Sequence, residues 1–435
     1  MPPRSARMAA QLASLIGFTG CADCGGARTG LFVPDFRRDD AGFDAPQPME
    51  AGIEAAVDVP VDTRPPHDLC VELPYEEPPE RVLVSFEARI QSADVLFLVD
   101  TTGSMNEEIE QIRRTIRDVL APAMRAEIPD VHISVAQFDD FPVGPYGSGP
   151  DRPLILLQSS TSDLALVQRA VDRMMRHFGG DEPESQVEAL YLTATGEGFG
   201  RWVPRALCPA GTVGYPCFRP RGARIILLFT DAPFHNGPDG AFPYGFDVVP
   251  RPHTYDDAVV ALRAIGARVL GLYSGPSGGE GWTHLQRVAR DTGAVEPTGR
   301  PIVFDIGADA RGLDRGVIES VRTLADEVLI DIDALAEDVP HVDDVDATVF
   351  VRRIAPLRAE PPSGARIRGA RFEDVRPGTR VTFSVELYND RYPPATEDRV
   401  YYLRIVLRGD GVTLLQETIV AIVVPGMRGG GCEAL

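Results

Sequence analysis

The chain has 435 residues, of which 44% are apolar and 25% are charged, and its formal net charge is −21 at pH 7. This length predicts two or more folded domains. The acidic charge disfavours nucleic acid and anionic lipid surfaces as partners, because both would be repelled, and it suits cations. All basic residues are arginines, which excludes a Schiff-base lysine, a lysine general base and the lysine-containing phosphate-binding loop.

Residues 1–21 have the pattern of a secretory signal peptide. Arg4 and Arg7 precede an apolar segment, 8–18, which is too short to span a membrane and is followed by small residues. The end of this segment resembles a bacterial lipoprotein signal, in which the cysteine at the position of Cys21 is lipidated. We predict an exported protein at the cell envelope or outer surface. Cys21 is a candidate for lipidation, and any membrane anchoring would come from that lipid alone. A cytosolic chain with an apolar N-terminus is the alternative.

Residues 22–79 are predicted to be an acidic, Pro- and Ala-rich flexible tether, because few large apolar side chains offset the entropy of ordering. Residues 80–328 alternate between strand and helix patterns, which predicts an α/β domain with a doubly wound, mostly parallel sheet. The predicted strands are 81–90, 95–99, 131–138, 154–157, 224–229, 268–273 and 302–304, and the predicted helices are 105–128, 164–175, 184–195, 255–265, 282–290 and 313–324.

The pattern changes in residues 329–435, where apolar and polar residues alternate. The runs 381–387 and 403–407 have the period of half-buried strands. Gly409-Asp410-Gly411 follows the second run and predicts a hairpin whose returning strand covers 414–424. We predict that this part of the chain forms a smaller, all-β domain of the sandwich type.

The six cysteines are Cys21, Cys24, Cys70, Cys208, Cys217 and Cys432. The segment 208–217 is rich in Gly and Pro and resembles a loop closed by a disulfide in an oxidising compartment, although two unpaired thiols are the alternative. Closing this loop would stabilise the fold by about 2–3 kcal/mol. Cys70 and Cys432 bracket the folded part and are the natural pair if Cys21 is lipidated, but pairings with Cys24 stay open.

The strand predicted at 95–99 ends in Asp100-Thr101-Thr102-Gly103-Ser104, and a helix follows. Ligands of open α/β sheets bind beyond the carboxyl ends of the strands, so Asp100, Thr102 and Ser104 lie where binding usually occurs. The two hydroxyls are spaced to face one ion, and Asp231 directly follows another predicted strand. Mg²⁺ prefers oxygen ligands and retains several waters, so these few oxygens suffice for a site with one open position.

These residues resemble the metal-ion-dependent adhesion site of the von Willebrand factor type A (vWA) domain, which begins with Asp-x-Ser/Thr-x-Ser. The resemblance spans about residues 93–327, and it is closest to bacterial exported members. It implies that Asp231 is the third element of the site and that Asp181, in Gly179-Gly180-Asp181-Glu182-Pro183-Glu184, stands in place of the usual threonine of the second. It also implies a Mg²⁺ cofactor, or Ca²⁺ or Mn²⁺, and a protein partner whose Asp or Glu completes the coordination.

Each element of this site has a plain structural alternative. Thr102 and Ser104 are suited to capping the following helix, Asp181 and Glu184 match a capping box, and Asp231 suits the turn at a strand end.

Further acids lie near the same loops. Glu107 and Glu108 resemble a pair that serves an adjacent metal site in integrin β subunits, and with Glu184 they are candidates for a secondary metal site. The alternative is that acids in a first helical turn are favoured by the helix dipole. Asp139 and Asp140 are predicted to be solvated loop acids.

These patterns predict a non-enzymatic, divalent-metal-dependent protein-binding module on an exported or surface-anchored protein. The first alternative is a structural envelope protein in which the metal only braces the domain. A remote alternative is an aspartyl phosphotransferase, since Asp100-Thr101-Thr102-Gly103 resembles the Asp-Lys-Thr-Gly of haloacid-dehalogenase-type enzymes, although the lysine of that motif is missing here. The sequence contains no HExxH zinc motif and no GxSxG nucleophile motif.

Overall fold

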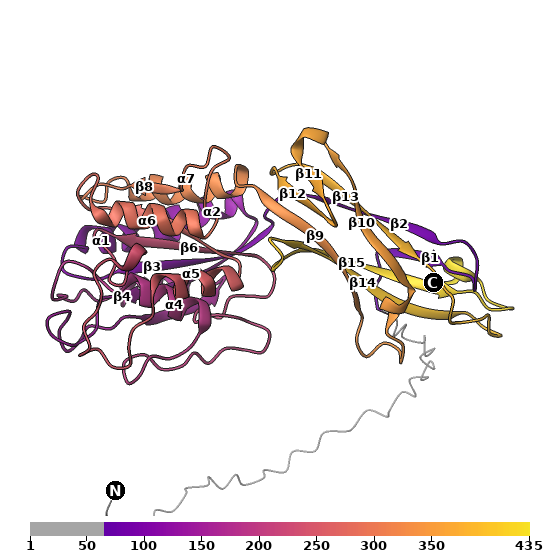
Figure 1. The fold of residues 1–435 in the computed structure, drawn as a ribbon, viewed down its shortest axis with the longest axis horizontal. Coiled ribbons are helices and arrows are strands. Elements are labelled where there is room, and N and C mark those ends of the chain that lie inside the picture. Colours follow the sequence, from indigo (N-terminus) through magenta and orange to yellow (C-terminus); the bar gives the residue numbers. More distant parts are fainter. Residues whose placement is uncertain (1–64) are drawn as a thin grey trace, which may run out of the picture. The chain divides into compact units, whose positions relative to one another are not determined.

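The computed structural model describes residues 65–435, which fold into an α/β part and an all-β part (Figure 1). The predicted signal peptide, Cys21, Cys24 and most of the predicted tether lie outside the described residues. Within residues 65–435, no helix has both the length and the apolar character that a membrane crossing requires.

The α/β part is built on a six-stranded sheet in the order β5-β4-β3-β6-β7-β8. Its strands are β3 (Ser92–Asp100), β4 (Asp130–Phe138), β5 (Ile155–Thr161), β6 (Ala223–Thr230), β7 (Ala267–Tyr273) and β8 (Val303–Asp305). All neighbouring strands are parallel except β4 and β5. The predicted doubly wound, mostly parallel sheet is confirmed.

Helices cover both faces of this sheet (Figure 1). They are α1 (Asn106–Thr115), α2 (Ala121–Glu127), α3 (Leu164–Asp172), α4 (Gln186–Thr195), α5 (Tyr255–Ala264), α6 (Glu280–Asp291) and α7 (Leu313–Asp326), and a short π-helical segment, η1 (Ile116–Leu120), joins α1 to α2. Because side chains alternate along a strand, Phe97 and Val99 of β3 pack against residues of α1, α2 and α7, while Leu96 and Leu98 pack against residues of α4 and α5. Burial on both faces explains the continuous apolar run of β3.

The chain reverses the direction of strand addition at β3. Strands β4 and β5 lie on one side of β3, and β6, β7 and β8 lie on the other. The crevice beyond the carboxyl ends of β3 and β6 is therefore the topological switch point, where ligands of such sheets bind. Asp100 is the last residue of β3 and Asp231 directly follows β6, so the topology brings together two strand ends that lie far apart in the sequence.

Two sheets form the all-β part and share one apolar core. One sheet has the order β1-β15-β14-β9-β12-β11 and the other has the order β10-β13-β2. The strands are β1 (Leu69–Glu72), β2 (Glu80–Glu87), β9 (Ile330–Asp338), β10 (Val351–Glu360), β11 (Arg366–Arg368), β12 (Arg371–Val375), β13 (Arg380–Leu387), β14 (Arg399–Gly409) and β15 (Thr413–Val424). Phe372 and Phe383, one from each sheet, pack edge to face with ring centroids 5.0 Å apart. The predicted hairpin at Gly409-Asp410-Gly411 is confirmed and joins β14 to β15.

The first two strands lie elsewhere than the sequence pattern suggested. Strand β1 falls in the range predicted to be a tether, and it pairs in parallel with β15. Strand β2 is confirmed as a strand, but it pairs with β13 of the all-β part and not with the α/β sheet. Alternating apolar residues such as Val82, Val84 and Phe86 predict a half-buried strand, but this pattern says nothing about which sheet buries it. The α/β part is consequently inserted between β2 and β9.

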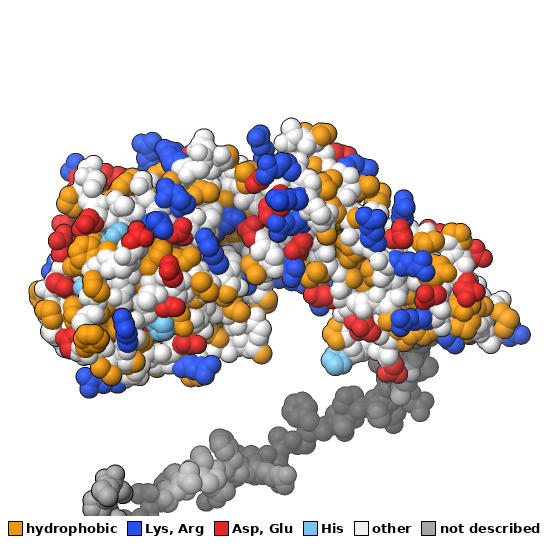
Figure 2. All heavy atoms as spheres, in the orientation of Figure 1, with side chains coloured by type: hydrophobic (Ala, Val, Ile, Leu, Met, Phe, Trp, Pro, Cys, Tyr) orange, Lys and Arg blue, Asp and Glu red, His pale blue; other side chains and the backbone are white. Residues whose placement is uncertain are grey.

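Two disulfides are present in the described residues. Cys208 and Cys217 close the Gly- and Pro-rich loop, and Cys70 in β1 is bonded to Cys432 near the other end of the chain, 362 residues away. Both predicted pairs are thus present in the structure, and they fit an extracellular protein because such bonds persist in oxidising compartments. Figure 2 shows arginine and acidic side chains intermixed over the face in view.

Candidate metal centre

The first loop of the site begins at the carboxyl end of β3, where the Asp100 carboxylate is buried. Asp100 Oδ1 accepts hydrogen bonds from the backbone N–H of Thr102 at 3.0 Å and from its hydroxyl at 2.7 Å. The Thr230 hydroxyl, at the end of β6, donates to Asp100 Oδ2 at 2.7 Å. Burial, followed by the negative charge of Asp231, raises the pKa of Asp100 to about 7. Ser104 lies on the same loop and is exposed.

The structure decides against helix capping by the residues of the first two loops. Helix α1 begins at Asn106, and its N-cap residue, Met105, makes no side-chain capping bond. The Thr102 hydroxyl is directed at Asp100 instead. Helix α4 begins at Gln186 after Ser185, so Asp181 and Glu184 precede the cap and form no capping box.

The second loop is attached to the third by backbone hydrogen bonds. The N–H of Glu184 donates to Pro233 O at 3.0 Å, and the N–H of His235 donates to Glu184 O at 2.8 Å. Gly179 has a φ of +66°, and a Cβ at this position would lie 2.8 Å from Glu184 Oε1 and 3.4 Å from Thr102 Cγ2. The left-handed backbone favours glycine at this position, and the missing side chain leaves room for Glu184 beside the first loop.

Glu184 is the most deeply placed acid of the second loop. Its side chain is only 4% exposed, and its Oε2 has no hydrogen-bond partner among the described residues. Burial raises its pKa well above the ordinary value, and the negative charges of Asp100, Asp140 and Asp139 raise it further. Asp181, by contrast, is 34% exposed, and its carboxylate faces His235 Nε2 at 3.2 Å. Its part in the first site stays a prediction.

Asp231 and Glu108 approach the same crevice from other elements. Asp231 directly follows β6 and is half-buried. Glu108 points inward from the first turn of α1, is 1% exposed, and has an Oε2 without a hydrogen-bond partner in the described chain. Burial raises its pKa to about 7, with a smaller contribution from the charge of Asp231. Glu107 is exposed, so the two neighbouring acids have different environments.

Asp139 and Asp140, which directly follow β4, are both fully buried. The prediction that they are solvated loop acids is therefore wrong. Asp139 Oδ1 accepts a hydrogen bond from the Thr101 hydroxyl at 2.6 Å, and its Oδ2 lies 2.7 Å from His177 Nδ1. The rule on the carboxyl ends of strands that singled out Asp100 applies equally to this pair, because β4 is the parallel neighbour of β3.

The acidic side chains of the crevice are not paired with arginine in the described residues, although arginine is the only strongly basic residue of this chain. Within residues 65–435, no arginine forms an ion pair with Asp100, Glu108, Glu184 or Asp231. Burying several carboxylates costs a great deal of free energy unless they are neutralised by a proton or a cation. These acids offer only oxygen ligands, as do the hydroxyls of Thr102 and Ser104, and oxygen ligands suit a hard divalent cation such as Mg²⁺, Ca²⁺ or Mn²⁺.

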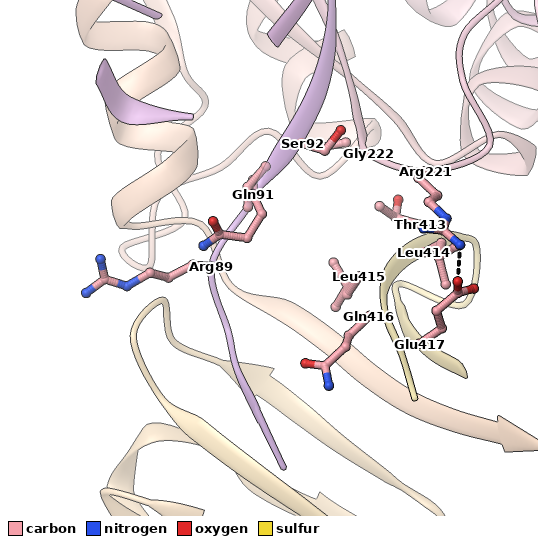
Figure 3. Close-up of a pocket in the computed structure, with 12 residues that line it drawn as sticks. Arg89, Gln91, Ser92, Arg221, Gly222, Thr413, Leu414, Leu415, Gln416 and Glu417 are labelled. Carbon is pink, nitrogen blue, oxygen red and sulfur yellow. Dashed lines mark hydrogen bonds and ion pairs between the residues drawn. The ribbon is translucent and has the colours of Figure 1, made fainter. Parts of the chain in front are cut away.

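A hollow lies at the start of β3, at the opposite end of the α/β sheet from Asp100 (Figure 3). Its lining includes Ser92 at the start of β3 and Leu415 and Glu417 of β15, and Arg221 pairs with Glu417. β3 runs from Ser92 to Asp100, a length of about 30 Å in an extended strand. This hollow is therefore separate from the acidic crevice. The one acid named in its lining, Glu417, is neutralised by Arg221.

Comparison with known proteins assigns the α/β part to a class. Residues 94–197 match the family model described as von Willebrand factor A domain. The matched segment runs from β3 through α4 and contains the first two loops of the crevice. The α/β part has a vWA-like fold, as its sequence resemblance implied. Among curated proteins, none matches the chain closely enough to count as a relative.

Several solved structures are similar to this chain at low identity. They include a von Willebrand factor type A protein from Catenulispora acidiphila, at 12% identity over 82% of this chain and 72% of that one, with a TM-score of 0.33. Proximal thread matrix protein 1 from the mussel byssus is 12% identical over 55% of this chain and 47% of its own, with a TM-score of 0.32. The pilus adhesin SpaC from Lactobacillus rhamnosus GG, in an open conformation, is 11% identical over 81% and 46%, with a TM-score of 0.33.

Proposed function

We propose that this chain is a non-enzymatic, divalent-metal-dependent protein-binding module of an exported or surface-anchored protein. The observation that carries the proposal is the group of buried or half-buried carboxylates at the switch point, which no arginine of residues 65–435 neutralises. The family match supports an interaction module, and the two disulfides support an extracellular location. Catalysis would need a nucleophile or a general base beside a substrate pocket. In this proposal the acids bind a cation and have no catalytic role.

In this proposal Asp100, Thr102, Ser104 and Asp231 hold a Mg²⁺, Ca²⁺ or Mn²⁺ ion, directly or through water. Glu184 provides negative charge beneath the first loop, and Glu108 provides it beside Asp231. The bound ion would supply a coordination position for an oxygen of the partner. Because a hard cation prefers charged oxygen ligands, the partner group is an Asp or Glu side chain presented on a protein surface.

Exposed apolar side chains next to the first loop support a docking surface. Phe178 is 82% exposed and Met175 is 63% exposed. A Cβ on Gly103 would lie 3.8 Å from Phe178 O, so Phe178 borders the DxTxS loop. A partner that places a carboxylate at the ion would therefore be able to bury the Phe178 ring at the same time.

The proposal is tested by Mn²⁺ binding and by partner capture. Mn²⁺ should bind the chain with water in its coordination shell, as measured by electron paramagnetic resonance and water proton relaxation, and acetate should displace part of that water. Capture of a partner from the surface fraction of the native organism should require Mg²⁺ and be abolished by a chelator. Asp231→Ala should abolish both Mn²⁺ binding and capture.

Phe178→Ala is the matched control, because it alters the docking surface without removing a metal ligand. This variant should bind Mn²⁺ as the wild type does and capture less partner. Capture that is indifferent to chelator and to Asp231→Ala would refute the proposal. A Mn²⁺ ion without exchangeable water would favour the structural alternative, in which the metal only braces the domain.

A further inference from the structure

A second group of potential metal ligands lies beside the acidic crevice and includes a histidine. Asp140 follows β4, Asp181 lies in the second loop and His235 lies in the segment after β6. One ligand atom from each of these side chains lies within 4.8 Å of the other two. His235 Nε2 is 3.2 Å from Asp181 Oδ2 and 3.4 Å from Asp140 Oδ2.

The hydrogen bond made by the Nδ1 atom of His235 determines which ring nitrogen faces these acids. His235 Nδ1 lies 2.7 Å from the backbone carbonyl oxygen of Phe242. A carbonyl oxygen only accepts hydrogen bonds, so Nδ1 carries a proton and donates it. In the neutral ring, Nε2 then directs its lone pair at the two carboxylates. This arrangement is the one in which metal-binding histidines are usually found, with the second nitrogen held by a carbonyl.

Asp140 has one oxygen that is fully engaged and one that is not. Its Oδ1 accepts hydrogen bonds from the Tyr244 hydroxyl and from the Phe141 N–H, both at 2.5 Å. Its Oδ2 is buried, has no hydrogen-bond partner in the described chain, and faces His235 Nε2. An unpartnered oxygen of a fully buried carboxylate, aimed at an imidazole nitrogen and a second carboxylate, is the observation that points to a missing positive charge.

Aromatic packing holds the histidine in place. The ring of His235 stacks on Tyr244 with centroids 4.2 Å apart and meets Tyr146 edge to face at 5.3 Å. A Cβ on Gly180 would overlap the backbone of Pro145 and Tyr146, so this glycine lets the second loop pack closely enough to bring Asp181 to His235. The ligand atoms are therefore positioned by the fold without any ion.

We propose that Asp140, Asp181 and His235 form a second metal site, distinct from the all-oxygen site, that binds Zn²⁺ or a similar first-row transition metal ion. Tetrahedral Zn²⁺ with bonds of 2.0–2.1 Å separates its ligand atoms by about 3.3 Å, which agrees with the distances of 3.2 and 3.4 Å measured from His235 Nε2. An imidazole with two carboxylates favours such ions over Mg²⁺ or Ca²⁺. Asp181 is 34% exposed, so the ion is reached from solvent, and a water fills the fourth position.

The inference does not rest on the proposed function, because each site has a test residue that the other site lacks. His235 belongs only to the second site and Asp231 only to the first. In this assignment Asp181 serves the second site, and Glu184 is the carboxylate of the second loop that faces the first.

The test is equilibrium dialysis of the full chain against Zn²⁺ in the presence of excess Mg²⁺, with the bound metal measured by mass spectrometry. The wild type should retain one Zn²⁺ per chain. His235→Gln should lower the Zn²⁺ affinity by more than about 100-fold, because it removes the nitrogen ligand. Asp181→Asn changes an exposed ligand without disturbing the core and should lower the affinity by about 10- to 100-fold. Co²⁺ should give the intense visible absorption of a tetrahedral site in the wild type and not in His235→Gln.

The matched control is His177→Gln. His177 is also a buried histidine beside two buried acids, Asp139 and Asp151, but its Nδ1 is already engaged by Asp139. His177→Gln and Asp231→Ala should both retain Zn²⁺ at wild-type affinity. The inference is overturned if the wild type retains no Zn²⁺, if His235→Gln and Asp181→Asn bind it as tightly as the wild type, or if only His177→Gln or Asp231→Ala loses it. Thermal unfolding without metal shows that each variant is folded.

Discussion

The two parts of this molecule use acidic residues in opposite ways. In the all-β part, acids pair with arginines at the partly exposed surface of the sheets, as Arg408 does with Asp333 at 2.9 Å and Arg404 with Glu337 at 2.6 Å. The core between those sheets is apolar. In the α/β part, acids are buried at the carboxyl edge of the sheet, and one of them, Glu184, has no basic partner within the described residues.

The difference shows that the all-β part is stabilised by its own side chains, whereas the acidic edge of the α/β part needs a proton or a bound cation. Ion pairs at the protein surface contribute little to the free energy of unfolding. Both members of each pair belong to the protein itself, so no ligand is needed. Clustered buried carboxylates destabilise the fold unless a proton or a cation neutralises them. The α/β part should therefore respond to metal and pH, whereas the all-β part should not.

The chain offers a direct way to observe the two parts separately. Its two tryptophans, Trp202 and Trp282, both belong to the α/β part. Tryptophan fluorescence consequently reports on the α/β part alone, while far-ultraviolet circular dichroism reports on both parts. The predictions below compare these two signals.

The largest effect is expected from the disulfide that joins the ends of the all-β part. Replacing Cys70 and Cys432 by serine should lower the free energy of unfolding of the all-β part by about 3–5 kcal/mol, since a crosslink across so long a segment strongly restricts the unfolded chain. Denaturant titration should show an earlier transition by circular dichroism and a nearly unchanged one by fluorescence. Replacing Cys208 and Cys217 is the control and should shift the fluorescence transition instead, by about 2–3 kcal/mol. Equal shifts of both signals would mean that the parts unfold as one unit.

The next largest effect is a dependence of α/β stability on pH. The pKa values of Asp100 and Glu108 in the folded, metal-free chain are raised to about 7 from 3.8 and 4.5. The folded state thus holds protons that the unfolded chain releases, so this stability is fully present below about pH 4 and is lost as the pH rises through about 7. In the presence of a chelator, raising the pH from about 5 to about 8 should move the fluorescence transition to lower denaturant concentration. The corresponding loss in the free energy of unfolding of the α/β part should be a few kcal/mol.

Adding Mg²⁺ should reverse this loss, and more so at about pH 8 than at about pH 5, because the ionised carboxylates bind the cation. Circular dichroism changes assigned to the all-β part should not follow Mg²⁺. A fluorescence transition that is independent of both pH and Mg²⁺ would contradict the assignment of these acids to a cation site.

The smallest effect compares one acid from each part. Glu184→Gln removes a buried charge that repels its neighbours, so the metal-free α/β part should become more stable by about 1–3 kcal/mol and respond less to Mg²⁺. Asp333→Asn removes a partly exposed ion pair and should destabilise the all-β part by less than about 1 kcal/mol, with no dependence on metal. If Glu184→Gln were destabilising without metal, Glu184 would be a satisfied core residue.

Much of the α/β part was predictable from the sequence. Period and composition predicted the strands and helices in order, because buried parallel strands and amphipathic helices leave strong local patterns. The motif after β3 identified Asp100 and Thr102 as neighbours, and the structure joins them by a hydrogen bond. The sequence pattern did not predict the π-helical segment η1 within the predicted helix.

The sequence also contained signals that were interpreted wrongly. Asp139 and Asp140 follow a buried strand at the same sheet edge as Asp100, yet two consecutive acids resemble an ordinary solvated loop. Thr230 directly precedes Asp231, and its hydroxyl donates to Asp100 Oδ2, a contact that the spacing along the chain does not indicate. Nothing in the spacing of His235 suggested that it would meet Asp140 and Asp181.

By itself, the sequence determined the class of the α/β fold, the hairpin of the all-β part, and the strand ends that carry the first site. Only the tertiary structure decided which sheet takes β1 and β2, which acids are buried, and that His235 faces two of them. The physical reason is that periodicity and capping are properties of neighbouring residues, whereas strand partners and buried charge depend on contacts between segments that lie far apart along the chain.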